Sequence, residues 1–429
     1  MPQLKTLIIL LLCATSLLPL PLRGQTAGST EGNDSRHHDF WNSSAQIDSD
    51  SLQISLLTCS SGQKAYDLYG HTALLVESLN NGPAWVFNYG VYNFNKPNFV
   101  WHFILGKNEY EIGIAPKSLF IGAYLREGRS VSQQVFNLSQ PEARRIAKAL
   151  IANYMLEDWT YAYDFYRDNC TTRAIDILPQ NGIAIDFHET QRLPVSFRSL
   201  LHQLTGSSPW TTFGNDILLG TGADKPTYRS RMVLPTYAEA ELEAATIGSP
   251  VNHSLQKLVI STLTYEPAVV FEPSKSAISP EVAGWIAIIV TLALTLFEWR
   301  RGKRLRLFDA SLMLVQGLGG CVIFILFFFS THSFVDSNWN ILWLNPLPLI
   351  ALPLLWAERK PFDTLLRAYC IMEIVCIAGV VFVVNALNLQ YIPLALTLMA
   401  QPLLIRALWN LLCPPSLNRT LATKTSKKP

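Results

Sequence analysis

Charged residues are few in this chain, and their signs nearly cancel. The 429 residues hold 34 Lys and Arg against 32 Asp and Glu, which leaves a formal net charge of +2. This balance gives no reason to expect a nucleic-acid partner. No group of His and Cys has zinc spacing, and no glycine-rich phosphate loop occurs. We therefore expect neither a metal nor a cofactor.

Charge is missing altogether from long apolar stretches in the C-terminal third. Asp, Glu, Lys and Arg are absent from residues 282–297, 310–335, 337–357 and 374–405. Because a helix crosses the hydrocarbon layer with about 20 apolar residues, these stretches predict an all-α transmembrane bundle of about five helices in residues 278–412. The spans are expected near 281–299, 309–330, 339–357, 368–387 and 390–408.

Basic residues orient this bundle. They follow the first span (Arg300, Arg301, Lys303), separate the third span from the fourth (Arg359, Lys360) and close the chain in a basic tail at 413–429. Lys and Arg are retained on the cytoplasmic side, so we expect the tail in the cytoplasm and the region before the bundle outside. At the N-terminus, Lys5 and the apolar run 6–20 predict a signal peptide or anchor at 1–24. A flexible leader at 25–50 and an exported domain at 51–277 follow.

Short β-branched and aromatic runs predict an antiparallel sheet in the exported domain. They lie at 51–58, 72–76, 85–89, 99–105 and 110–114. Helices are expected at 139–152, capped by Ser139, and at 170–178, capped by Asp168 or Asn169. The fold class is therefore α+β. The apolar stretch 210–219 fits a lipid-facing groove or lid as well as it fits an ordinary core.

Two motifs about a hundred residues apart carry the candidate chemistry, Tyr69-Gly70-His71-Thr72 and Asp168-Asn169-Cys170-Thr171-Thr172. A cysteine in the first turn of a helix meets unpaired N–H groups and the positive end of the helix dipole, which favour its thiolate. An imidazole on a nearby strand can hold that thiolate and relay its proton. Cys170 is the candidate nucleophile, with its own N–H as oxyanion donor, and His71 is the candidate base. Asn88, on the next strand, is the candidate for orienting His71.

Each of these residues also has a structural interpretation. The exported domain contains two cysteines, Cys59 and Cys170, and an even count in an oxidising compartment fits a disulfide. His71 fits a structural histidine, and Asn88 fits a turn amide that bonds its own backbone. Three further residues either support the site or only pack and cap: Tyr69, Asp168 and Asn169.

Several ordered segments of the exported domain resemble known families. A histidine followed by an Asn-Cys pair at a helix start resembles the circularly permuted papain-like proteins related to NlpC/P60 and lecithin:retinol acyltransferase. A longer set is similar to the exported domain of the Bacteroides-type lipoprotein N-acyltransferases over about residues 50–270. It includes Leu57-Thr58-Cys59, Tyr69-Gly70-His71-Thr72, Phe87-Asn88-Tyr89-Gly90, Tyr161-Ala162-Tyr163-Asp164-Phe165, Asp168-Asn169-Cys170-Thr171-Thr172 and Met232-Val233-Leu234-Pro235.

This resemblance implies a permuted papain-like periplasmic domain on a bacterial inner membrane. The implied reaction moves a fatty acyl chain from a membrane phospholipid, through a thioester on Cys170, to the α-amino group of a diacylglyceryl-cysteine lipoprotein. Cys170 and His71 match the family's catalytic positions. A cysteine peptidase or amidase and a phospholipase remain as alternatives that use the same residues. A non-enzymatic membrane scaffold with Cys59 bridged to Cys170 is the remaining alternative.

Overall fold

The computed structural model describes residues 47–80, 82–92, 98–155, 160–248, 254–270, 277–357 and 359–413. The predicted signal peptide, most of the leader and most of the basic tail lie outside these residues. The chain divides into two compact units. Among the described residues, the first unit contains those before Ser208 and those of Lys225–Ser274, and the second contains Ser208–Asp224 and the C-terminal helices.

A seven-stranded sheet lies at the centre of the first unit, with the spatial order β12-β5-β1-β2-β3-β4-β6. All of its strand pairs are antiparallel, which confirms the predicted sheet and the α+β class. The strands are β1 (Leu52–Cys59), β2 (His71–Ser78), β3 (Ala84–Val91), β4 (Glu109–Pro116), β5 (Val131–Phe136), β6 (Thr160–Ala162) and β12 (Val259–Tyr265).

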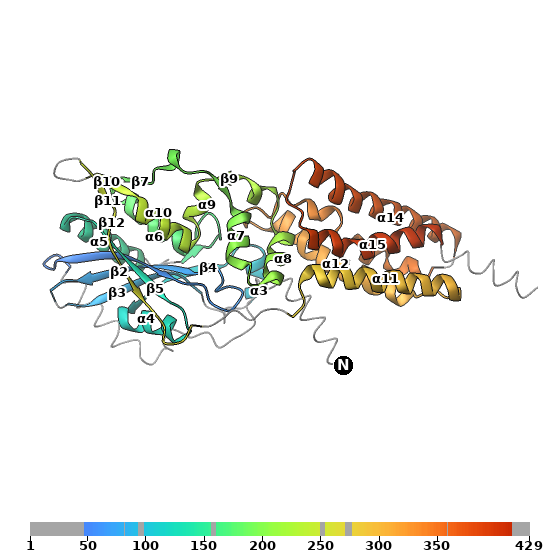
Figure 1. The fold of residues 1–429 in the computed structure, drawn as a ribbon, viewed down its shortest axis with the longest axis horizontal. Coiled ribbons are helices and arrows are strands. Elements are labelled where there is room, and N and C mark those ends of the chain that lie inside the picture. Colours follow the sequence, from blue (N-terminus) through green and yellow to red (C-terminus); the bar gives the residue numbers. More distant parts are fainter. Residues whose placement is uncertain are drawn as a thin grey trace, which may run out of the picture. The chain divides into compact units, whose positions relative to one another are not determined.

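Helices cover both faces of this sheet (Figure 1). One face carries α5 (Gln140–Met155), α6 (Cys170–Gln180) and α10 (Pro235–Ala244), and the other carries α4 (Lys117–Arg126). The neighbours Leu74 and Leu75 of β2 are both fully buried, but in different apolar clusters. Successive side chains of a strand point to opposite faces, so a strand buried on both sides has a continuous apolar sequence. The apolar start of β2 therefore follows from its central place in the sheet.

One predicted strand is wrong, because residues 99–105 form helix α3 (Phe99–Ile104) instead. The β-branched and aromatic content of this run favoured a strand, but strand preference mainly measures fit to a half-buried pleated surface. Val100 and Trp101 are 45% and 51% exposed and pair with no strand of the described sheet. The two predicted helices are confirmed as α5 and α6, with Asn169 as the cap of α6.

Smaller elements complete the first unit. Helices α7 (Phe197–Thr205) and α9 (Arg229–Met232) accompany two small sheets, which contain three and two strands. The larger of the two consists of β7 (Ile185–Asp186), β10 (Thr246–Gly248) and β11 (Leu255–Lys257). The smaller consists of β8 (Val195–Ser196) and β9 (Pro226–Thr227).

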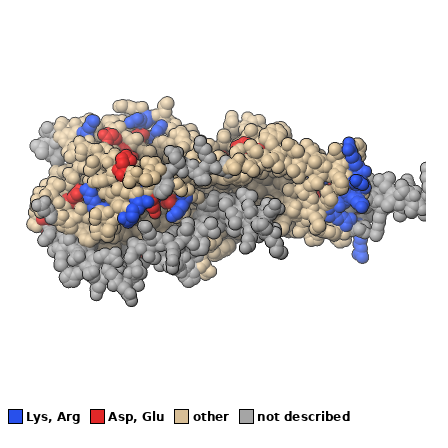
Figure 2. Space-filling view, turned by 60° about the horizontal axis from the view of Figure 1, so that its bottom comes forward, with Lys and Arg blue, Asp and Glu red and all other residues tan. Residues whose placement is uncertain are grey.

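The second unit is helical. Among the described residues, 4 helices are long and apolar enough to cross a membrane. They are α11 (Pro280–Arg301), α12 (Arg306–Phe329), α14 (Lys360–Ala378), which continues as a π-helix over Gly379–Val384, and α15 (Leu394–Leu412). Figure 2 shows the Lys and Arg side chains of this unit gathered at one end, as expected for the cytoplasmic ends of the spans.

The third predicted span is not one continuous helix. Residues 339–357 contain the 3₁₀ turn Trp339–Leu342, helix α13 (Leu347–Ala351) and the 3₁₀ turn Leu352–Leu355. Proline has no N–H to donate, and its ring clashes with the preceding turn of a helix. Three prolines interrupt this stretch, Pro346, Pro348 and Pro353. The third predicted span is therefore divided into short helical segments among the described residues.

The apolar stretch 210–219 folds as helix α8 (Pro209–Leu218) and belongs to the helical unit. The Asn338 side chain donates to the carbonyls of Ile217 and Leu218 at 2.6 and 3.0 Å. The backbone N–H of Gly220 donates to the carbonyl of Phe334 at 2.7 Å. The predicted exported domain, 51–277, thus includes a segment that is held by the loops of the helical unit.

Candidate functional site

The histidine of the first motif is the first residue of β2. Gly70, just before it, has φ +78°, and a Cβ there would lie 2.9 Å from the carbonyl oxygen of Cys59. Only glycine enters β2 through so tight a turn without strain. The Nε2 atom of His71 lies 2.5 Å from Oδ1 of Asn88 on the adjacent strand β3. This hydrogen bond leaves Nδ1 of His71 for the Cys170 thiol.

The cysteine of the second motif is the first residue of α6, and Asn169 caps that helix. Oδ1 of Asn169 accepts from the N–H groups of Thr171 and Thr172 at 2.8 and 3.0 Å. The Thr172 hydroxyl accepts in return from the N–H of Asn169 at 2.8 Å, which completes a capping box. Across the described part of the chain, the N–H of Cys170 has no hydrogen-bond acceptor. That donor remains available to a ligand.

The two catalytic candidates form a hydrogen-bonded pair, in which Cys170 is buried and His71 is partly buried. Burial raises the pKa of the Cys170 thiol, but the charge and hydrogen bond of His71, together with the Thr72 N–H and the Thr171 hydroxyl, bring it below its ordinary value of 9.0. Burial likewise lowers the pKa of His71, but Cys170 and Asn88 raise it above its ordinary value of 6.5. The site therefore favours a thiolate beside an imidazolium.

Strand β2 and helix α6 are also connected directly beside this pair. The hydroxyl of Thr72 lies 3.0 Å from the hydroxyl of Thr171, and both side chains are buried. Each threonine immediately follows a catalytic candidate in the sequence. The contact therefore fixes the strand that carries His71 against the helix that carries Cys170.

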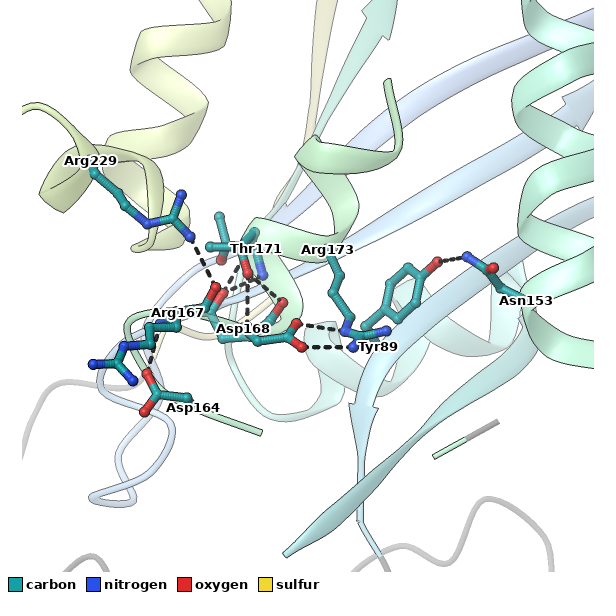
Figure 3. Close-up of polar contacts among 10 residues, drawn as sticks. Tyr89, Asn153, Asp164, Arg167, Asp168, Thr171, Arg173 and Arg229 are labelled. Atoms are coloured by element: carbon teal, nitrogen blue, oxygen red, sulfur yellow. Dashed lines mark hydrogen bonds and ion pairs between the residues drawn. The ribbon is translucent and has the colours of Figure 1, made fainter. Parts of the chain in front are cut away.

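The remaining predicted site residues have different surroundings. Asp168 forms two hydrogen bonds with Arg173, at 2.6 and 2.7 Å (Figure 3). Tyr69 is partly exposed and lies in the turn that enters β2. Cys170, His71 and Asn88 are thus brought together, Asn169 and Asp168 act around the start of α6, and Tyr69 belongs to the turn before His71.

Cys59 and Cys170 are both free thiols, so the predicted alternative of a disulfide between them does not describe this structure. Cys59 is fully buried on β1, opposite His71 in the antiparallel register. Burial raises the pKa of the Cys59 thiol, in contrast to the lowered pKa of Cys170. The pKa values of the two cysteines of the first unit are therefore shifted in opposite directions.

Sequence reasoning missed the aromatic surroundings of the thiol. Tyr161 of β6 is buried, and its ring centroid lies 6.5 Å from that of Tyr89 and 6.4 Å from that of Tyr110. The guanidinium of Arg173 lies 3.6 Å from the centroid of the Tyr161 ring. The alternation of aromatic and small side chains in Tyr161-Ala162-Tyr163 is typical of a strand, but it does not indicate that this strand lies beside Cys170. In the part of the chain that is described, no group of three or more His, Cys, Asp or Glu could hold a metal ion.

Comparison with known protein families gives two matches. The model for the Lnb N-terminal periplasmic domain matches residues 39–203, and the model for the Lnb transmembrane domain matches residues 272–414. Searches of curated proteins and of solved structures found no match. The first matched region contains Cys170, His71 and Asn88, and the second contains the apolar helices. The matches confirm the predicted periplasmic domain and multi-pass anchor, and the chain contains both of the domains that these Lnb family models describe.

Proposed function

We propose that this protein is a thiol-dependent N-acyltransferase. It takes a fatty acyl chain from a membrane phospholipid and transfers it to the α-amino group of a diacylglyceryl-cysteine lipoprotein. The observation that carries the proposal is the pairing of Cys170 at the start of α6 with His71, whose other ring nitrogen bonds Asn88. A helix-terminal thiolate with an oriented imidazole is an arrangement that supports covalent acyl transfer.

In the first half-reaction, the Cys170 thiolate attacks the carbonyl carbon of the phospholipid ester. The tetrahedral intermediate collapses by breaking the bond between that carbon and the ester oxygen. The imidazolium of His71 gives its proton to the departing oxygen, which leaves as the hydroxyl of a lysophospholipid. The acyl chain remains on Cys170 as a thioester.

In the second half-reaction, the α-amine of the lipoprotein attacks the thioester carbonyl. Neutral His71 accepts a proton from the attacking nitrogen, the carbon–sulfur bond breaks and Cys170 leaves as the thiolate. The product carries a new amide bond, and the thiolate–imidazolium pair is restored. The hydrogen bond from His71 to Asn88 holds the ring in one orientation for both proton transfers.

Two features favour transfer to an amine over hydrolysis. Cys170 is only 8% exposed, so bulk water has little access to the thioester. The transmembrane domain keeps the site at a bilayer, where the phospholipid and the lipid-anchored acceptor are both concentrated. A peptidase acting on soluble cell-wall peptides has no need of such an anchor.

The test uses the full-length protein in vesicles that contain a phospholipid with isotope-labelled acyl chains and a diacylated lipopeptide with a free N-terminus. We expect the labelled chain to appear in amide linkage on the lipopeptide, and we expect Cys170→Ser to abolish it. Cys59→Ala, which removes the other thiol of the same unit, is the matched control and should retain the activity. Release of labelled free fatty acid without acylated lipopeptide would identify a phospholipase, and cleavage of the peptide would identify a peptidase.

A further inference from the structure

The geometry points to an oxyanion site in which the Tyr161 hydroxyl acts together with the backbone N–H of Cys170. The inference rests on the proposed acyl transfer and adds a catalytic residue to it. Tyr161 belongs to β6, which is the last strand of the sheet on the β4 side. In the sequence, Tyr161 is part of neither the motif that contains the thiol nor the motif that contains its base.

Atoms of Cys170, Tyr161 and His71 lie close together around a small space beside Gly90. A Cβ on Gly90 would lie 3.6 Å from Cβ of Cys170, 3.8 Å from the Tyr161 hydroxyl oxygen and 4.0 Å from Cε1 of His71. Its chain neighbours aside, Gly90 has no closer atom around that position. The Cβ of Cys170, the Tyr161 hydroxyl and the ring of His71 therefore surround one point beside Gly90, which no side chain of Gly90 fills. A reacting carbonyl group needs a position of this kind.

The Tyr161 hydroxyl is an unexplained polar group of the fold. The residue is 7% exposed, and its buried oxygen has no hydrogen-bond partner within the described chain. An unsatisfied buried polar group is costly and uncommon in native proteins. Burial raises the pKa of Tyr161 most, and the negative charge of the Cys170 thiolate raises it further. The phenol therefore keeps its proton and acts as a donor. A substrate oxyanion at the Gly90 space would supply the missing acceptor.

Arg173 holds the phenol in place and strengthens it as a donor. Its guanidinium lies 3.6 Å from the centroid of the Tyr161 ring, within the range of a cation–π contact. Asp168 fixes the same guanidinium through two hydrogen bonds (Figure 3). A cation over the ring withdraws electron density, and the charge of Arg173 accordingly opposes the rise of the Tyr161 pKa. Arg173 and Asp168 are positioning residues, and this gives the predicted supporting residue Asp168 a specific task.

The chemical step involves no proton transfer to or from Tyr161. When the thiolate adds to the carbonyl carbon, the carbonyl electron pair moves to oxygen. The resulting oxyanion accepts hydrogen bonds from the Tyr161 O–H and the Cys170 N–H. The same two donors stabilise the second tetrahedral intermediate, which forms when the amine attacks the thioester. Both half-reactions therefore depend on Tyr161.

The experiment compares Tyr161→Phe with the wild type, because this change removes the oxygen and keeps the ring. Loss of one oxyanion donor lowers kcat by about 10² to 10³-fold, and we expect a loss of that size in the acylation rate with little change in KM. The matched control is Tyr163→Phe. Tyr163 lies two residues further along the chain, and its ring stacks on that of Tyr110 with 4.4 Å between the ring centroids. This variant should keep the wild-type acylation rate.

Alkylation of Cys170 by iodoacetamide separates this role from a structural one, because that reaction forms no oxyanion. We expect Tyr161→Phe to be alkylated at the wild-type rate while its acylation rate falls. Equal acylation in Tyr161→Phe and the wild type would overturn the inference. A matching fall in both rates would also overturn it, because Tyr161 would then only maintain the thiolate.

The positioning role of Arg173 is tested by combining variants. Arg173→Met should lower acylation in the wild type but should have little further effect in Tyr161→Phe, since it acts through the phenol. Additive losses would contradict that role.

Full activity of Cys170→Ser would overturn the proposed function itself. Inactivity of Cys170→Ser beside full activity of Tyr161→Phe would leave that function in place and remove only the oxyanion assignment.

Discussion

The imidazole of His71 is held between a thiol and an amide, with its Nε2 atom 2.5 Å from Oδ1 of Asn88. The amide oxygen can only accept, so Nε2 carries a proton, and Nδ1 exchanges a proton with Cys170. One hydrogen bond between adjacent strands therefore fixes both the tautomer and the direction of the ring.

Asn88→Ala should weaken this orientation without removing the base. A hydrogen bond to a charged group contributes roughly 1.5–3 kcal/mol, which corresponds to about a 10 to 150-fold lower kcat. The rate of amide-linked acyl transfer measures the effect. Asn88→Asp, which keeps an acceptor in the same place, is the control and should retain more activity than Asn88→Ala. Wild-type turnover by Asn88→Ala would show that the ring is oriented by other groups.

The thiol should react as a thiolate at pH values where an ordinary cysteine is protonated. The pKa of Cys170 lies below its usual 9.0, so iodoacetamide alkylation at this residue should persist at lower pH than for a model thiol. In His71→Ala the burial of the thiol is no longer opposed by the imidazolium, so the midpoint of the alkylation profile should move to a higher pH than in the wild type. Peptide mass analysis at Cys170 follows the reaction. An unchanged profile in His71→Ala would contradict the ion pair.

Activity should fall on both sides of a pH window. On the acid side, protonation of the Cys170 thiolate removes the nucleophile, and the lowered pKa places this loss below pH 9.0. On the alkaline side, the raised pKa of His71 keeps the imidazolium above pH 6.5, and turnover falls when that proton is lost. The pH dependence of acylation by the intact protein measures both limits. A rate that rises steadily with pH through 9.0 would exclude this assignment.

Gly90→Ala should block the site more than it destabilises the fold. The new methyl group would occupy the space between Cys170, Tyr161 and His71 at contact distances of 3.6–4.0 Å. The φ of +88° adds strain of about 1–2 kcal/mol for a residue with a Cβ. Gly128→Ala, at φ +71° after α4, is the control for that strain. We expect a similar shift in thermal midpoint for both variants and loss of acylation only at Gly90. Equal activities would contradict the site geometry.

The sequence was most informative where structure depends on local interactions. Asn169 and Thr172 form a capping box from residues three positions apart, so the start of α6 and the place of Cys170 were predictable. The role of Tyr161 was not predictable, because it depends on the pairing of β6 with β4 across the sheet. Likewise, no local pattern indicates that α8 is held by Asn338, 120 residues away from Leu218.

The most direct test of the central claim is the intact mass of the protein after incubation with phospholipid and without an acceptor. The account predicts an added mass of one acyl chain, located on Cys170, removed by neutral hydroxylamine and absent from Cys170→Ser. Addition of the diacylated lipopeptide should return the protein to its original mass as the lipopeptide gains that chain. Acyl transfer to the lipopeptide by Cys170→Ser at the wild-type rate would contradict the account.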